Sequence, residues 1–239
     1  MPWVLRCAAV VAALAVAACD VAAPPSAPAT TGSTTTEPRL SPGAAARGFV
    51  SVVETVEPVA ERECRRRTQG ANCDFLILVD DRPNQPPNAF QTRDETGRPV
   101  LAFTLALIAD ARNTDELAFV MGHEAAHHIL GHLDRQQRNA AAGALIFAGL
   151  ASVTGGTGAD IRQAQELGAV VGARSYSKEF ELEADELGTI IAHRAGYDVL
   201  RGAEFFARIP DPGNRFLGTH PPNAQRATAV RNTLARIGG

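Results

Sequence analysis

The six residues Gly122-His123-Glu124-Ala125-Ala126-His127 carry the pattern HExxH. On an α-helix, positions i and i+4 lie almost above one another, so His123 and His127 can offer two imidazole nitrogens to one metal ion. Glu124 lies one position round the helix, where its carboxylate can polarise a water bound to that metal. The stretch therefore predicts a metal site on a helix, and such a site needs a further ligand from elsewhere in the chain.

Composition narrows the class of protein. The chain has 239 residues, of which 45% are hydrophobic and 21% charged, as in a globular protein with one domain of ordinary size and short attachments. Its net charge of −3 offers no excess of basic charge, so no nucleic-acid partner is predicted. Aromatic residues make up only 5%, which is compatible with a largely helical core of small side chains.

Residues 1–18 have the features of a bacterial lipoprotein signal peptide. Arg6 supplies a positive charge, an apolar run from Cys7 to Ala18 follows, and small residues precede Cys19. This order resembles a lipobox, which implies cleavage before Cys19 and attachment of lipid to it. The chain would then be anchored on the periplasmic side of the bacterial cell envelope, in the inner or outer membrane. The alternative is a plain signal peptide cut near Ala18, with Cys19 incidental.

Residues 19–43 are rich in Pro, Thr and Ala without an apolar period, which predicts a disordered tether. A folded domain is expected over residues 44–239. It begins with an amphipathic helix, because apolar residues recur at three- and four-residue spacing over residues 49–60. Cys64 and Cys73 then bracket a polar segment, and this pair is expected to form a disulfide that closes a helix-to-strand turn.

A small sheet is predicted between this turn and the HExxH motif. Residues 75–79 indicate a buried strand because the run is apolar throughout, and residues 88–92 and 100–103 are two further strand candidates. Residues 113–116 resemble a capping box that would start the helix carrying HExxH. That helix is expected to continue beyond His132.

The second half of the chain is predicted to be helical. Residues 140–153 are apolar and would span about 21 Å as a helix, which is short of the ~30 Å core of a bilayer. A packed helix or a lid over the cleft is therefore expected there. Helical patterns follow over residues 162–196, with a break near 172–177, over 200–209 and over 223–236.

A third metal ligand is available on one of these helices. Catalytic zinc generally has three protein ligands, and the segment Glu181-Leu182-Glu183-Ala184-Asp185 lies about 55 residues after the HExxH motif. Glu181 and Asp185 are four positions apart and share a face. One of them can bind the metal while the other accepts a hydrogen bond from a ligand imidazole. Glu183 points away from that face and is expected to be solvated.

Three motifs in this order resemble the HtpX-like family of zinc metallopeptidases, which also contains the CAAX prenyl protease and periplasmic lipoprotein members. The motifs are HExxH at residues 123–127, ExxAD at residues 181–185, and Thr219-His220-Pro221 followed by Arg226. The resemblance extends over about residues 45–235, and it implies that the folded domain of residues 44–239 is a zinc metallopeptidase domain. It implies a zincin-like α+β fold that is mainly helical, with a small β-sheet beside the HExxH helix.

The resemblance implies that one Zn²⁺ per chain is bound by His123, His127 and Glu181. Glu124 would act as the general base, taking a proton from the zinc-bound water and passing it to the leaving amine. Asp185 would orient a ligand histidine.

His220 is implied to lie near the metal, where it would stabilise the tetrahedral oxyanion or occupy the fourth coordination position in a resting state. Arg226 is expected to be structural and to hold the loop of His220. Of the remaining histidines, His128 faces away from the metal and is expected to pack. His132 lies on a different face and is expected to make a structural hydrogen bond.

These features predict an endopeptidase that hydrolyses peptide bonds in misfolded or envelope proteins, with the polypeptide substrate extended along an edge strand. Soluble or unfolded periplasmic proteins are favoured over prenylated membrane proteins, because the sequence predicts no membrane-spanning helix. One alternative is a chaperone-like or binding protein whose weakly active site is closed by His220 and residues 140–158. Another is an exopeptidase or other zinc hydrolase with the same metal site. The oligomeric state is not predicted.

Overall fold

The computed structural model describes residues 38–215 and 217–238. The predicted signal peptide, the lipid anchor at Cys19 and most of the predicted tether lie outside the described residues and stay predictions. The first helix, α1 (Pro42–Arg67), begins slightly before residue 44, with its proline in the first turn, where a missing backbone N–H has no intrahelical partner to lose.

One face of α1 packs on the rest of the domain. Phe49, Val52 and Val56 are buried at three- and four-residue spacing, as the amphipathic pattern predicted. A disulfide between Cys64 and Cys73 joins the end of α1 to the segment that leads into the sheet. The disulfide predicted from these two cysteines is therefore confirmed.

Removing this disulfide is expected to lower the free energy of unfolding by about 2.5–3 kcal/mol, the loop-closure entropy of a loop of about ten residues. The double variant Cys64→Ser/Cys73→Ser tests this in urea unfolding, and replacing both cysteines avoids a free thiol. Wild type unfolded in a reductant should show the same loss. An unchanged unfolding midpoint in both experiments would contradict the expectation.

Three strands form a sheet with the order β1-β3-β2. β1 (Leu76–Asp80) runs parallel to β3 (Pro99–Thr104), and β2 (Ala89–Arg93) runs antiparallel to β3 on its other side. All of β3 is buried, as expected of a central strand. The prediction of a buried first strand was wrong: Leu78 and Val79 are 45% and 44% exposed, because β1 is an edge strand that is only partly covered.

The HExxH motif lies on α3 (Thr114–Ile129), which packs against β2 and β3. This helix starts where the capping pattern predicted, because the side-chain oxygen of Asn113 accepts a hydrogen bond from the backbone N–H of Glu116 at 3.0 Å. Its expected continuation beyond His132 was wrong. The helix ends at Ile129 because Gly131 adopts a left-handed conformation with φ of 65°, a common helix terminator.

The third ligand candidate lies on α6 (Ser177–Arg194), which crosses α3 at very short range. A Cβ added to Gly122 would lie 2.7 Å from the backbone oxygen of Gly188, so the two backbones touch at this point. Only glycine permits such an approach. The crossing holds α6 against the face of α3 that carries the HExxH histidines.

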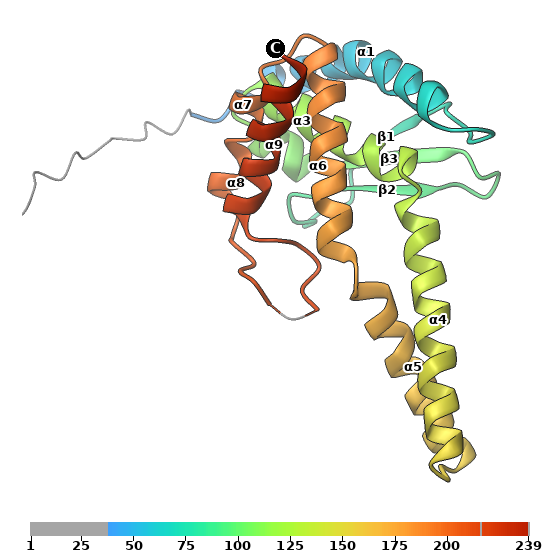
Figure 1. Cartoon of the computed structure of the whole chain (residues 1–239). Helices are drawn as coiled ribbons and strands as arrows, with labels where there is room; N and C mark the ends of the chain where they lie inside the picture. Colours follow the sequence, from blue (N-terminus) through green and yellow to red (C-terminus); the bar gives the residue numbers. More distant parts are fainter. Residues whose placement is uncertain (1–37, 216, 239) are drawn as a thin grey trace, which may run out of the picture. The chain divides into compact units, whose positions relative to one another are not determined.

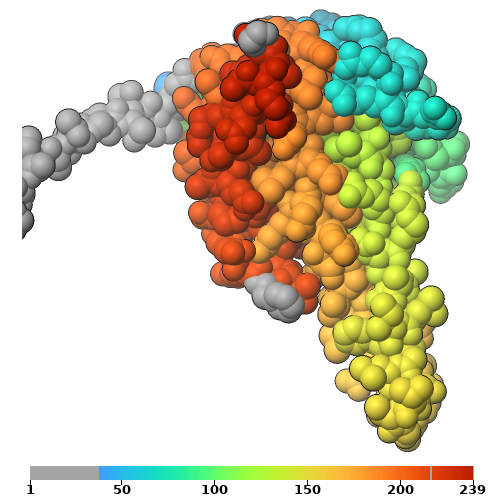
Figure 2. Space-filling view, viewed as in Figure 1, coloured from blue at the N-terminus to red at the C-terminus, as the bar shows by residue number. Residues whose placement is uncertain are grey.

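In the chain between α3 and α6, α4 (His132–Val153) and α5 (Gly158–Arg174) form a helical hairpin that extends away from the sheet (Figures 1 and 2). Gly143 and Gly168 approach so closely that a Cβ on either would lie 2.1–2.2 Å from the backbone oxygen of the other. Residues 140–153 are therefore helical, as expected, but packed only in part: the segment contacts α5, while Leu145, Ile146, Leu150 and Val153 are 60–82% exposed.

The hairpin does not form the alternative, a lid. The cleft described below is lined by Leu133 and Gln136 near the start of α4, but by no residue between 137 and 176. Among residues 38–215 and 217–238, no helix has the length and apolar character needed to cross a membrane.

The remaining helices are α2 (Leu105–Asp110), α7 (Val199–Gly202), α8 (Phe205–Arg208) and α9 (Asn223–Ile237). The single helix predicted over residues 200–209 is thus two short helices, and α9 packs along α6 (Figure 1). The described residues are mostly helical with one small sheet, so the predicted α+β class is confirmed.

Candidate metal centre

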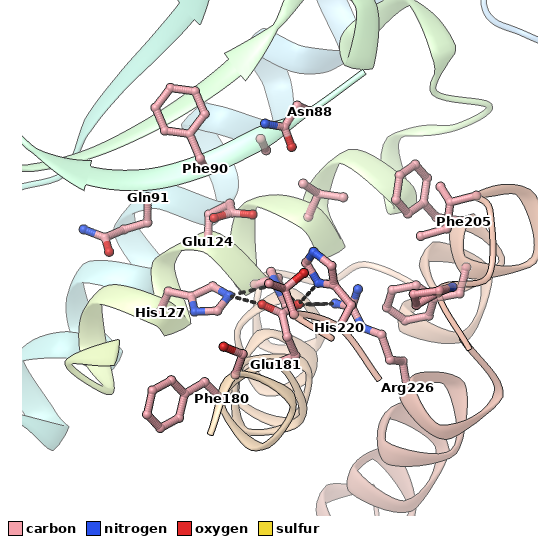
Figure 3. Close-up of a pocket in the computed structure, with 18 of the residues that line it drawn as sticks. Asn88, Phe90, Gln91, Glu124, His127, Phe180, Glu181, Phe205, His220 and Arg226 are labelled. Atoms are coloured by element: carbon pink, nitrogen blue, oxygen red, sulfur yellow. Dashed lines mark hydrogen bonds and ion pairs between the residues drawn. The ribbon is translucent and has the colours of Figure 1, made fainter. Parts of the chain in front are cut away.

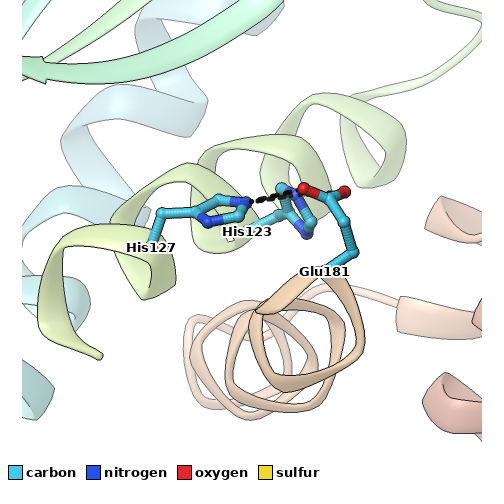
Figure 4. A group of neighbouring side chains, drawn as sticks. All are labelled: His123, His127 and Glu181. Atoms are coloured by element: carbon cyan, nitrogen blue, oxygen red, sulfur yellow. Dashed lines mark hydrogen bonds and ion pairs between the residues drawn. The ribbon is translucent and has the colours of Figure 1, made fainter. Parts of the chain in front are cut away.

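Three side chains converge from two helices, with His123 and His127 on α3 and Glu181 on α6 (Figure 4). The two Nε2 atoms are 3.0 Å apart. The carboxylate of Glu181 lies 3.4 Å from Nε2 of His127 and 3.6 Å from Nε2 of His123. The structure therefore brings together the three residues that the sequence predicted as ligands.

These distances fit a metal ion. A tetrahedral zinc with ligand bonds of 2.0–2.1 Å holds neighbouring ligand atoms about 3.3 Å apart. The two Nε2 atoms are 3.0 Å apart, Oε1 of Glu181 lies 3.4 Å from Nε2 of His127 and Oε2 of Glu181 lies 3.6 Å from Nε2 of His123, so these distances lie around that value. Two imidazole nitrogens and one carboxylate are also the donor set that catalytic zinc prefers. The cluster could therefore hold a metal ion without rearrangement of its helices.

A buried ion pair orients His123. Its Nδ1 lies 2.9 Å from the carboxylate of Asp185, which is completely buried. Arg226 of α9 donates two hydrogen bonds of 2.7 Å to the same carboxylate. Because a carboxylate only accepts, Nδ1 of His123 carries the hydrogen and Nε2 keeps its lone pair for a metal. Arg226 was expected to hold the His220 loop; the structure pairs its guanidinium with Asp185.

Both buried carboxylates are ionised at neutral pH. Burial opposes ionisation of Asp185, but Arg226 and His123 together hold its pKa below the ordinary value of 3.8. Burial likewise opposes ionisation of Glu181, and the hydrogen bonds from His127 and His220 hold its pKa well below 4.5. The site thus offers negative charge to a cation.

His127, the other predicted ligand histidine, has a different partner. Nδ1 of His127 lies 2.8 Å from Nδ1 of His132, whose Nε2 lies 3.0 Å from the carboxylate of Glu183. Arg135 also binds Glu183. Burial lowers the pKa of His132 to about 4. The structural hydrogen bond predicted for His132 is confirmed, whereas Glu183 is paired rather than only solvated, although its side chain is 41% exposed.

A cleft opens beside the ligand cluster (Figure 3). Glu124 is 8% exposed and lines this cleft together with His123 and His127. Other side chains in the lining come from the β2 edge, from α6 and from α8 with the loop after it: Asn88, Phe90, Gln91, Phe180, Phe205, Ile209 and Pro210. The lining of the cleft thus combines apolar side chains with the carboxylates and imidazoles of the ligand cluster and Glu124.

His220 reaches the ligand cluster from the loop before α9. Its Nδ1 lies 3.0 Å from the carboxylate of Glu181, and its side chain is 52% exposed (Figure 3). The histidine is therefore near the ligand cluster, as predicted. His128, in contrast, is buried away from the cleft, where its Nε2 is 2.7 Å from the backbone oxygen of Asn72, which confirms its packing role.

Comparison with known proteins identifies the family. The model of peptidase family M48 matches residues 51–234, from α1 through α9, which includes every predicted site residue. The chain belongs to peptidase family M48. It is therefore a metallopeptidase, a hydrolase of peptide bonds, and the resemblance drawn from the three motifs is confirmed.

Relatives of this M48 chain include the beta-barrel assembly-enhancing proteases of Escherichia coli strain K12 and of Shigella flexneri. Each is 32% identical over 149 residues, which cover 53% of this chain and 29% of the relative. The protein of Escherichia coli O157:H7 matches to the same extent. The chain thus matches less than a third of the length of these relatives.

Proposed function

We propose that this chain is a zinc-dependent endopeptidase with a zincin-like fold that cleaves unfolded or misfolded proteins of the bacterial cell envelope. The observation that supports this most strongly is the cluster of His123, His127 and Glu181, with Glu124 in the same cleft. Membership of a peptidase family supports the same reaction class.

Zinc held by His123, His127 and Glu181 would supply the positive charge that acidifies water and polarises a substrate carbonyl. Glu124 takes the proton of the attacking water and passes it to the leaving amine. Asp185 keeps His123 in the orientation that a metal requires. His220 donates a hydrogen bond to the oxygen on which negative charge develops.

An extended polypeptide fits the walls of this cleft. β2 is an edge strand of the described sheet, and Asn88, Phe90 and Gln91 on and beside it line the cleft. An edge strand has backbone groups free to pair with an added strand. A substrate bound in this way is recognised through its main chain, which favours unfolded segments over folded domains.

The proposed location rests on the N-terminal sequence. Residues 1–18 resemble a lipoprotein signal peptide, and lipid on Cys19 would anchor the chain on the periplasmic side of the inner or outer membrane. The relatives are named for beta-barrel assembly, which agrees with polypeptide partners in the envelope.

A second candidate function is a chaperone-like protein with a closed, weakly active site. It is favoured by the contact between His220 and Glu181, because that contact occupies one oxygen of the third ligand.

Cleavage of an unfolded protein such as reduced casein, measured with and without a zinc chelator, separates the two functions. We expect the zinc-loaded chain to cut within the substrate, to lose activity in the chelator and to regain it when zinc is added. Cleavage that is indifferent to the chelator would contradict the zinc mechanism. Retention of the unfolded protein without cleavage would instead favour the chaperone-like function.

A further inference from the structure

The two histidines that face the proposed metal position are supported in different ways. Nδ1 of His123 meets the carboxylate of Asp185 directly at 2.9 Å. Nδ1 of His127 meets another imidazole, that of His132, at 2.8 Å. A carboxylate is reached only one step further on, where Nε2 of His132 lies 3.0 Å from Glu183.

The hydrogens of this chain of contacts have a single arrangement that permits metal binding. Nε2 of His132 must carry a hydrogen, because the carboxylate of Glu183 only accepts. If His132 is neutral, its Nδ1 is then an acceptor and Nδ1 of His127 must donate to it. Nε2 of His127 is thereby left with a free lone pair on the side of Glu181. The opposite arrangement would place a hydrogen where the metal must bind.

We propose that His132 and Glu183 are positioning residues that fix the tautomer and ring orientation of the metal ligand His127. This inference rests on the proposed zinc site and adds a second support to it. The pair of Asp185 and Arg226 contacts the ligand His123 directly. The ligand His127 is instead held by a relay of two contacts, from His127 to His132 and from His132 to Glu183.

The surroundings make the relay rigid. His132 is only 4% exposed, and its ring stacks on Phe180 with centroids 4.7 Å apart and an interplanar angle of 10°. The guanidinium of Arg135 lies over the ring of Phe180, 4.2 Å from its centroid, and also forms an ion pair with Glu183. A ring that is stacked, buried and bonded at both nitrogens has little freedom to rotate, so it can hold His127 in one orientation.

The relay also links three elements. His132 is the first residue of α4 and follows Gly131, whose left-handed conformation ends the HExxH helix and redirects the chain. Glu183 lies on α6, two positions after the ligand Glu181. The contact therefore ties the base of the helical hairpin to both helices that supply metal ligands.

Zinc affinity, measured by competition with a chromogenic chelator, tests the proposal. The variants are His132→Phe, which preserves the stacked ring but has no acceptor, and Glu183→Ala. Each should bind zinc about 10–100-fold more weakly, the usual effect of losing an outer partner of a ligand histidine. Glu186→Ala is the matched control, because Glu186 lies on the same helix in an exposed ion pair with Arg236, and it should bind zinc like wild type.

Conservative variants test the assigned hydrogen-bond directions. His132→Asn keeps an acceptor near the former Nδ1, and Glu183→Gln keeps an acceptor for Nε2–H, so each should recover part of the lost affinity. The visible spectrum of the cobalt-substituted protein should change in His132→Phe, because a reoriented His127 alters the ligand field at the cobalt ion. The spectrum should stay constant in Glu186→Ala.

Three outcomes separate this inference from the function on which it rests. Wild type that binds no zinc would overturn the proposed metal site itself. Wild type that binds zinc, with all four relay variants equal to it, would overturn the relay and leave the metal site standing. A lower melting temperature of the metal-free His132→Phe protein with unchanged zinc affinity would show a role in folding alone and would also overturn the relay.

Discussion

Replacing Glu124 by glutamine is expected to lower kcat for an unfolded protein substrate by about 10²–10⁴-fold, the range of a lost general base. Glutamine has nearly the same shape but cannot take a proton from water. Zinc should be retained at one ion per chain, because Glu124 is not among the three converging ligand atoms. Cleavage kinetics and zinc content measured on the same preparation check both halves of the prediction.

The matched control is Glu54→Gln, which changes an exposed glutamate on α1 far along the chain from the cleft. It should leave kcat and zinc content as in wild type. If Glu124→Gln cleaves at the rate of this control, Glu124 is not the base. If it loses zinc together with activity, the carboxylate contributes to metal binding and its assigned role is wrong.

Replacing Arg226 by methionine is expected to lower the free energy of unfolding by about 3–5 kcal/mol, because one partner of a buried charge pair is removed. The carboxylate of Asp185 is fully buried, and Arg226 supplies two of its hydrogen bonds. Without them an anion remains in the interior, and among the described residues its side chain keeps a polar contact only with His123. Urea unfolding with a chelator present measures the effect without a contribution from metal affinity.

Arg236→Met provides a close comparison, because Arg236 also lies on α9 and also pairs with a carboxylate of α6, that of Glu186. Arg236 and Glu186 are both exposed, so the loss of this ion pair should cost less than about 1 kcal/mol. The double variant Arg226→Met/Asp185→Leu should recover part of the stability lost in the single variant. Equal, small losses for Arg226→Met and Arg236→Met would contradict the assigned role of the buried pair.

The candidate metal ligands could be predicted because their arrangement is local. His123 and His127 share a helix face through their spacing alone, and the same holds for Glu181 and Asp185. The resemblance to the HtpX-like family then implied which carboxylate serves which role. Placing residues on one helix face needs only the helix period and a residue that starts the helix. Asn113 starts the HExxH helix, because its side-chain oxygen accepts a hydrogen bond from the backbone N–H of Glu116.

What could not be predicted depends on how helices cross. The pairing of His132 with Glu183 arises because α3 and α6 touch at Gly122 and Gly188, and no sequence spacing reveals that contact. The bond from Arg226 to Asp185 depends in the same way on the packing of α9 along α6. The break before His132 did have a local signal, since Gly131 is a typical residue at the end of a helix.

The exposure of β1 was missed for a related reason. Its apolar run is equally consistent with a central and an edge strand, and only the strand order separates the two. The chain between Cys73 and the HExxH helix places β3, the last of the three strands, at the centre of the sheet. β1 is therefore an edge strand, and Leu78 and Val79, which point to opposite faces of the sheet, are both partly open to solvent.

The most direct test of the central claim is the zinc content of the purified chain and of its Glu181→Ala variant, measured by elemental mass spectrometry after dialysis against a weak chelator. Wild type should hold one zinc ion per chain, Glu181→Ala should hold almost none, and Glu186→Ala should match wild type. Retention of one tightly bound zinc ion by Glu181→Ala would show that His123, His127 and Glu181 are not the metal ligands.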